Sequence, residues 1–173
     1  MKLKYTTPIE WAEQAVEDID SFLQDHADAE RKVANMCLSL IAKYPNRTEI
    51  IDELIQISVE ELLHFKQVYE LIRYRGHQLN GVFQKDPYIK GLMSIVRSDS
   101  DELFMDRLII ASIAELRGSE RFKLIGDVVK DEKISKFYCL IALYARNRSF
   151  TRSIAIYKRV NYFGLKFFLI IQN

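Results

Sequence analysis

The sequence is poor in residues that cross-link or interrupt a chain. Its 173 residues include three prolines, six glycines and two cysteines, Cys37 and Cys139. Two isolated cysteines cannot build the disulfide framework of a small secreted domain, so we expect a reduced, cytoplasmic protein. The N-terminus lacks the apolar core of a signal peptide, and the apolar run at 167–171 is far shorter than the roughly 20 residues that span a bilayer. We therefore expect no association with membranes.

Acidic residues are missing from the last 41 residues. The first 132 residues hold all 24 acidic side chains and 17 of the 25 lysines and arginines, so their formal charge is −7, while the remainder carries +8. The net charge of +1 alone argues neither for nor against a nucleic-acid partner. The change in charge along the chain needs its own explanation.

Apolar residues make up 49% of the chain, enough for the core of one domain spanning residues 1–173. They recur at helical spacing, and no segment shows the alternation of a strand or a glycine-rich phosphate loop. We predict helices from Pro8 to about residue 23, from Asp25 to about 44, at 48–75, 88–96 and 101–126, and from about 131 onward. The connection at 76–100 is long enough to cross over a helical bundle.

Two ionisable residues lie on the apolar face of the predicted helix at 48–75. That face contains, at alternating steps of three and four residues, Leu54, Ile57, Glu61, His64, Val68 and Leu71. Burying a carboxylate without a partner is costly, so Glu61 and His64 require mutual pairing, a hydrogen-bond network or a metal. Side chains at positions i and i+3 share one face of a helix, so both can reach the same ion.

Glutamates also interrupt the apolar faces of two other predicted helices. Glu30 precedes Val33 and Ala34 by one turn, and Glu115 lies in a face that continues through Gly118, where a neighbouring helix or bound group could approach closely. Three carboxylates and an imidazole suit a pair of iron or manganese ions.

Other ionisable residues fit a metal site less well. Glu60 lies beside the apolar face on its wet side, and Glu120 is better placed to pair with Arg117 or Lys123. His26 could donate to Glu30 from one turn away, but a role near a helix start is the simpler interpretation, and His77 reads as a loop residue.

Several motifs give the chain a family resemblance over residues 7–138. They are Thr7-Pro8, Trp11, Asp25-His26-Ala27, Glu30, Lys32, Glu60-Glu61-Leu62-x-His64-Phe65-x-Gln67-Val68 and Glu115-x-Arg117-x-x-Glu120-Arg121-Phe122. With these motifs the sequence resembles the bacterial tRNA 2-methylthio-N6-isopentenyladenosine hydroxylases. The last two motifs together are the most specific part of the resemblance.

The resemblance implies a ferritin-like four-helix bundle with an extra N-terminal helix and a long crossover between the second and third bundle helices. It implies a di-iron monooxygenase that uses O2 and an external electron donor to hydroxylate the isopentenyl group beside the tRNA anticodon. The resemblance further implies that the iron ligands in this chain are Glu30, Glu61, His64 and Glu115, with Glu61 as a bridging carboxylate. No catalytic residue beyond these ligands is implied.

The resemblance fails on the last predicted helix. A second Glu-x-x-His is expected at positions 145 and 148, where the periodicity also places the apolar face, but this chain has Ala145 and Arg148. Arginine has no lone pair to offer a metal. We therefore take residues 7–138 as the bundle core and 139–173 as atypical. One hypothesis is a shifted reading frame after about residue 138, because particular codons for residues 147–151 would encode Glu-x-x-His one base out of frame.

Two alternatives to the hydroxylase stay open. One is a bundle without a metal that binds RNA through its basic tail; the residues for phosphate contacts would be Arg146, Arg148, Arg152, Lys158 and Arg159. The other is iron storage or peroxide detoxification on the same fold.

Overall fold

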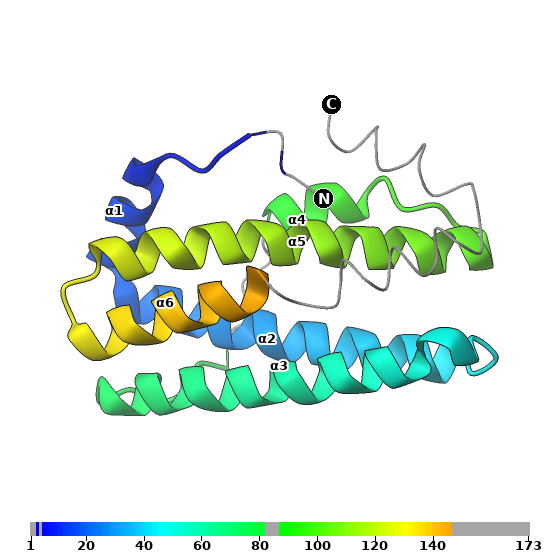
Figure 1. Ribbon diagram of the computed structural model, residues 1–173, viewed down its shortest axis with the longest axis horizontal. Coiled ribbons are helices and arrows are strands. Elements are labelled where there is room, and N and C mark those ends of the chain that lie inside the picture. Colours follow the sequence, from blue (N-terminus) through cyan, green and yellow to red (C-terminus); the bar gives the residue numbers. More distant parts are fainter. Residues whose placement is uncertain (1–2, 4, 82–86, 147–173) are drawn as a thin grey trace. The chain divides into compact units, whose positions relative to one another are not determined.

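The computed structural model describes residues 3, 5–81 and 87–146 (Figure 1). Within these residues the protein has six helices and no strand, which confirms the predicted all-α class. The helices are α1 (Ile9–Glu17), α2 (Ile19–Lys43), α3 (Thr48–Tyr74), α4 (Pro87–Met93), α5 (Ser100–Val128) and α6 (Glu132–Arg146). In the described part of the chain, no helix is both long and apolar enough to span a membrane.

The boundary between the first two helices differs from the prediction. The chain breaks at Asp18, whose side chain accepts a hydrogen bond from the backbone N of Ser21 at 3.1 Å and so caps α2. Asp25, the predicted cap, is an exposed residue inside α2. Aspartate is a favoured N-cap at either place, so the predicted start was wrong by almost two turns.

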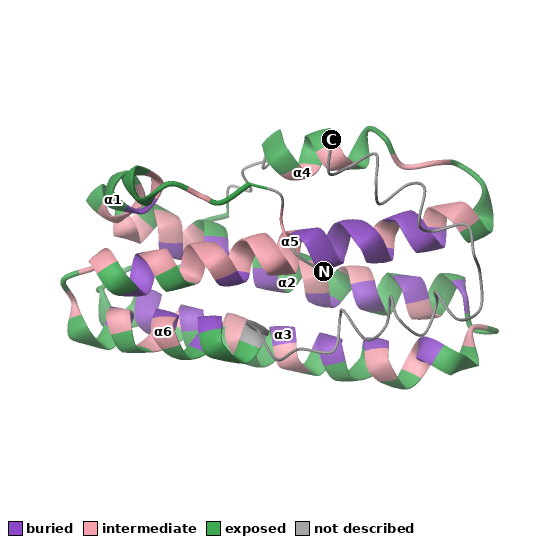
Figure 2. Ribbon diagram, turned by 45° about the horizontal axis from the view of Figure 1, so that its top comes forward, coloured by how far each residue is buried: buried purple, intermediate pink, exposed green. Residues whose placement is uncertain are grey.

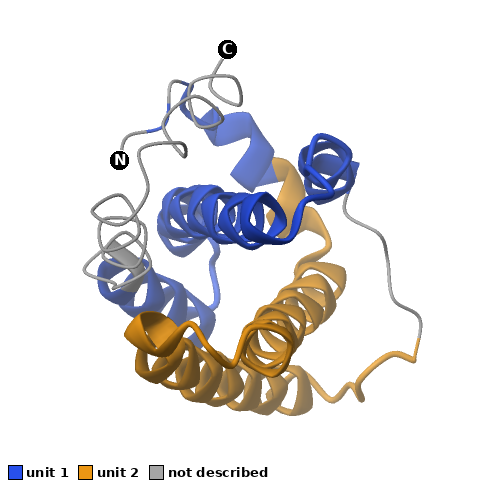
Figure 3. Cartoon of the chain, turned by 90° about the vertical axis from the view of Figure 1, so that its right-hand side faces the viewer, with its two compact units in different colours: residues 1–13, 85–173 blue, residues 14–84 orange. Residues whose placement is uncertain are grey.

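The helices fall into two compact units, which Figure 3 distinguishes by colour. Unit 2, residues 14–84, contains α2 and α3, which run antiparallel beside each other around a turn at Pro45. Unit 1 consists of residues 1–13 and 85–173 and contains most of α1 together with α4, α5 and α6. The prediction of one domain over residues 1–173 stays a prediction.

The core of unit 2 follows the predicted apolar faces (Figure 2). All members of the predicted face of α3 are buried except His64, which is half buried. The buried apolar residues of α2, which packs against α3, include Leu23, Ala27, Ala34, Cys37 and Leu40. Fully burying one aliphatic side chain contributes roughly 1.5–3 kcal/mol, so this two-helix seam fixes which faces of α2 and α3 meet.

Polar side chains tie the open end of the α2–α3 hairpin together. Asp20 accepts hydrogen bonds from Arg75 Nε at 2.8 Å and from its Nη2 at 3.0 Å. Gln24 donates to the carbonyl of Gln78 at 2.8 Å and accepts from the backbone N of Asn80 at 3.0 Å. The chain leaving α3 is therefore fastened to the first turns of α2.

In unit 1, α5 and α6 pack closely near the turn that joins them. A Cβ added at Gly126 would lie 2.7 Å from Cys139 Sγ and 3.0 Å from its backbone N, so only glycine fits there. Ser135 adds a hydrogen bond to the Gly126 carbonyl at 2.6 Å. At Gly118, where a close approach was predicted, an added Cβ would meet the Phe122 ring of the same helix at 3.6 Å.

A buried carboxylate holds the link between α4 and α5. Asp106, fully buried on α5, accepts from Arg97 Nε at 2.9 Å, Nη2 at 2.6 Å and the backbone N at 2.9 Å. Arg97 also donates to Glu102 at 2.7 Å. This bidentate pair stabilises the end of the long connection that follows α4.

The N-terminal segment is bound to α5 by the pair that the sequence predicted. Arg117 Nη1 donates to Glu120 Oε2 at 2.6 Å, which confirms Arg117 as the partner of Glu120. Glu120 also accepts from the backbone N and Oγ1 of Thr7, at 3.0 and 2.7 Å. Lys123 pairs instead with Asp127.

Candidate metal centre

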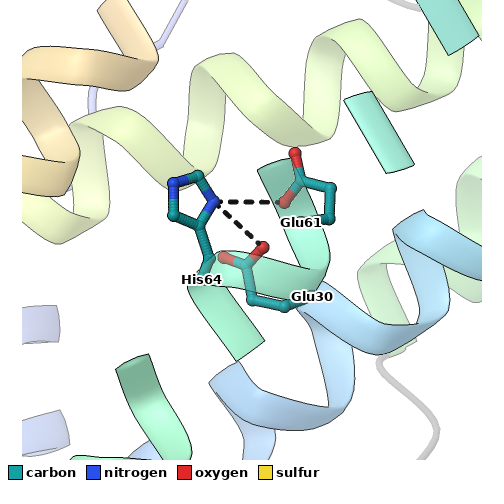
Figure 4. Close-up of side chains that lie close together, drawn as sticks. All are labelled: Glu30, Glu61 and His64. Atoms are coloured by element: carbon teal, nitrogen blue, oxygen red, sulfur yellow. Dashed lines mark ion pairs between the residues drawn. The ribbon is translucent and has the colours of Figure 1, made fainter. Parts of the chain in front are cut away.

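Three of the four predicted ligands come together between α2 and α3 (Figure 4). Glu30 lies in the middle of α2, while Glu61 and His64 lie one turn apart on α3. His64 Nδ1 is 3.6 Å from Glu30 Oε2 and 3.5 Å from Glu61 Oε2. One potential ligand atom from each residue lies within 4.8 Å of the others, so all three could bind one ion.

The two carboxylates are buried, and their surroundings keep negative charge on the pair. Burial raises the pKa of the Glu30 carboxyl, but hydrogen bonds with Glu61 and His26 and the nearby His64 imidazole outweigh it and hold that pKa well below its usual range. An ionised Glu30 carboxylate would favour a cation placed beside it.

His26 joins this group, although its position in the sequence favoured a role near a helix start. Its Nε2 lies 2.7 Å from Glu30 Oε1, and the residue is 4% exposed. The predicted start of α2 at Asp25 hid this role, because it placed His26 at the helix end. In the structure His26 lies about two turns inside the helix. The i, i+4 spacing from Glu30 already indicated that this contact was possible.

The remaining predicted ligand belongs to the other unit, and two of the rejected candidates lie on or just after α3. Glu115 is half buried on α5 and belongs to unit 1, whereas Glu30, Glu61 and His64 belong to unit 2. Glu60 is half buried beside the group on α3. His77 lies on the surface, with its Nε2 3.3 Å from Asp20 Oδ2.

The positions expected to carry a second Glu-x-x-His are not described in full. Ala145 and Arg146 belong to α6, but their side chains lie outside the described residues, as does all of Arg148. The same holds for Arg152, Lys158 and Arg159 of the basic tail and for the segment on which the hypothesis of a shifted reading frame rests.

The donor set of the three grouped residues fits a transition metal. Carboxylate oxygens and an imidazole nitrogen are the ligands that non-haem iron and manganese take in helical bundles. The buried Glu30–Glu61 pair supplies negative charge that a cation would neutralise. The residues present are therefore compatible with an iron site.

Comparisons with known proteins agree with these features. The model of the family described as tRNA-(MS[2]IO[6]A)-hydroxylase (MiaE) matches residues 1–161, beyond the segment over which the sequence motifs extend. The tRNA 2-(methylsulfanyl)-N(6)-isopentenyladenosine(37) hydroxylase of Pseudomonas putida is 36% identical over 132 residues, which are 76% of this chain and 63% of that protein. The hydroxylase of the same name from Salmonella typhimurium is 30% identical over 125 residues, 67% of this chain and 45% of that protein.

The fold also has a solved counterpart. A Synechococcus protein with aldehyde deformylating oxygenase activity matches with a TM-score of 0.79 and 27% identity, over 91% of this chain and 76% of that one. The all-helical fold is thus similar to that of a ferritin-like oxygenase. This chain spans less than two thirds of the length of either curated hydroxylase, but the family match covers most of its own residues. The chain belongs to the MiaE family of tRNA hydroxylases.

Proposed function

We propose that this chain is an O2-dependent di-iron monooxygenase that hydroxylates the isopentenyl group of 2-methylthio-N6-isopentenyladenosine in tRNA. The observation that carries the proposal is the group of Glu30, Glu61 and His64, with both carboxylates buried, in a chain of the MiaE family. The relatives from Pseudomonas putida and Salmonella typhimurium are named for this reaction.

The residues that would hold the iron are Glu30, Glu61, His64 and Glu115. Bound iron supplies the reductive activation of O2 that attack on an unactivated C–H bond requires. One oxygen atom enters the C–H bond and the other leaves as water, so each turnover consumes two electrons from an external donor and two protons.

The residues of the chain prepare the site for a cation. Glu30 and Glu61 are 7% and 3% exposed, so bulk water competes little for their oxygens. Carboxylate and imidazole ligands bind a metal only when deprotonated, so metal loading should depend on pH. Most apolar residues on the faces of α2 and α3 that carry the group are buried, which restricts the movement of the ligands before a metal arrives.

The proposal includes a finer architecture. In it, α2, α3, α5 and α6 form a ferritin-like four-helix bundle, α1 is the extra N-terminal helix, and the connection containing α4 crosses over between the second and third bundle helices. The similarity to the Synechococcus oxygenase supports this arrangement. A cytoplasmic location is proposed with it, because the substrate is tRNA.

Iron content and hydroxylation of tRNA bearing the isopentenyl group test the proposal together. The wild-type chain should retain iron and convert the modified adenosine to a product heavier by one oxygen atom, measured by mass spectrometry of nucleosides. Glu61→Ala should lose both, whereas Glu60→Ala, at the adjacent half-buried position, should keep both. A wild-type chain that binds no iron and leaves this tRNA unchanged would contradict the proposal.

A second candidate function rests on Ala145 and Arg148, which replace the expected second Glu-x-x-His. In this alternative the protein is a bundle without metal that binds RNA through its basic tail. Its affinity for RNA should then fall steeply with salt, and a variant with Arg148, Arg152, Lys158 and Arg159 changed to glutamine should lose most of that salt dependence. A salt dependence unchanged in this variant would exclude the tail as the RNA contact.

A further inference from the structure

The two oxygens of the Glu30 carboxylate have different neighbours. Oε1 lies 2.7 Å from His26 Nε2, at normal hydrogen-bond distance. Oε2 is the oxygen that lies 3.6 Å from His64 Nδ1, on the side of the ligand group. One oxygen of the carboxylate thus faces a histidine on its own helix, and the other faces the candidate metal centre.

The contact between His26 and Glu30 depends on α2 alone. The two residues are at i and i+4, so their side chains lie on the same face of the helix. The side chain of His26 is 1% exposed and that of Glu30 is 8% exposed, so water cannot readily replace either partner. The Phe22 ring, one turn before His26 on α2, lies 6.4 Å from the imidazole, centroid to centroid.

The chemistry of the contact also fixes the direction of the hydrogen bond. An ionised carboxylate only accepts hydrogen bonds, so Nε2 of His26 must carry the hydrogen and donate it to Oε1. A donor held on one oxygen occupies one of its two lone pairs and limits rotation of the carboxylate, which favours the other oxygen for metal binding. Groups that orient ligands in this way commonly affect metal affinity as much as some ligands do.

We propose that His26 is a positioning residue for the metal centre: it holds Oε1 of Glu30 so that Oε2 alone is offered to the metal. This inference rests on the proposed metal site, and it assigns Glu30 as a ligand through one oxygen. Without His26 the carboxylate can rotate or hydrogen-bond more closely with Glu61, and the site loses its preset geometry.

Titration with Co2+, followed by its visible absorption, tests this role without measuring enzyme activity. His26→Leu keeps a comparable apolar volume but has no donor, and it should weaken Co2+ binding by roughly 10- to 100-fold and alter the absorption bands. His26→Gln can place an amide N–H near the position of Nε2 and should recover most of the affinity and the wild-type bands. His77→Leu removes a surface histidine outside the group and should bind as the wild type does.

The outcomes separate this inference from the proposed function. If the wild type binds Co2+ and His26→Leu binds it equally well with the same absorption, the positioning role is wrong while the metal site stands. Equal losses in His26→Leu and His26→Gln, with unfolding midpoints near that of the wild type, would show that the donor is not what matters and would also overturn it. A wild type that binds no metal overturns the proposed site and this inference together.

Discussion

Among single residues, Glu30 and Cys37 show how neighbours decide the charge of a buried group. Both lie on the inner face of α2, and burial opposes ionisation of each. Glu30 has enough hydrogen-bond partners to reverse that effect. Cys37 does not: burial, and then the negative charge of Glu61, raise the pKa of its thiol to about 12, against which a hydrogen bond with Ser58 acts only weakly.

The thiol of Cys37 should make stability depend on pH in alkaline solution. Its pKa is about 12 in the folded protein and 9.0 as the reference value, so between these values the unfolded chain ionises while the folded one stays protonated. Stability is therefore full below about pH 9 and falls above it, by at most about 1.4 kcal/mol per pH unit. Urea unfolding at about pH 8 and about pH 10 should show this fall in the wild type and less of it in Cys37→Ala.

The second cysteine provides the control for this measurement. Cys139→Ala retains Cys37 and should keep the steeper loss of stability. If Cys37→Ala loses as much free energy of unfolding with rising pH as the wild type, the thiol does not ionise on unfolding in the way that its burial requires.

At the scale of helices, the crossing of α5 and α6 depends on one glycine. Two of the atoms nearest to an added Cβ at Gly126 are backbone atoms of α6, Cys139 N at 3.0 Å and Ser135 O at 3.3 Å. Backbone atoms cannot move aside as the end of a flexible side chain can. A larger residue at Gly126 must therefore push the two helices apart.

A pair of glycine substitutions on α5 tests this crossing. Gly126→Ala should lower the free energy of unfolding by about 1–3 kcal/mol, the usual effect of overpacking. Gly118→Ala meets only ordinary contact with Phe122 and gains helix propensity, so it should be neutral or stabilising by up to about 1 kcal/mol. Equal effects of the two substitutions in urea unfolding would contradict the close crossing at Gly126.

These helices also show what the sequence could and could not predict. The range 48–75 was correct to within one residue for α3, because Pro45 precedes it and Gly76, with a positive φ of 82°, ends it. The start of α2 was missed because two aspartates were equally good caps. Helical spacing also could not predict whether α5 meets another helix closely at Gly118 or at Gly126. The position of that contact depends on residues distant in sequence.

The sequence could predict those residues of the candidate site that stand out in the pattern of a single helix. Glu61 and His64 were found because they interrupt an apolar face of one helix, and Glu30 because it interrupts another. The spacing also indicated that His26 could reach Glu30, but only burial and the 2.7 Å contact favour that role over a position near a helix end. Whether Glu115 shares the site depends on packing between distant segments, which spacing does not fix.

For the whole molecule, the proposed ligands are divided unequally between the two units. Glu30, Glu61 and His64 all belong to the α2–α3 hairpin, so unit 2 can hold a metal with its own side chains. Glu115 belongs to unit 1. On the proposal that Glu115 is a ligand, metal binding stabilises both units; otherwise it stabilises only the hairpin.

Hydrogen exchange with and without metal distinguishes these cases. At a metal concentration about 100 times the Kd, binding stabilises the segments that it involves by about 2.7 kcal/mol, which slows their exchange about 100-fold. In the wild type, α2, α3 and the part of α5 around Glu115 should all be protected. In Glu115→Gln, protection of α5 should disappear, while α2 and α3 keep part of theirs because three ligands remain. Equal protection of α5 in both proteins would remove Glu115 from the ligand set, and no protection of the hairpin would remove the site itself.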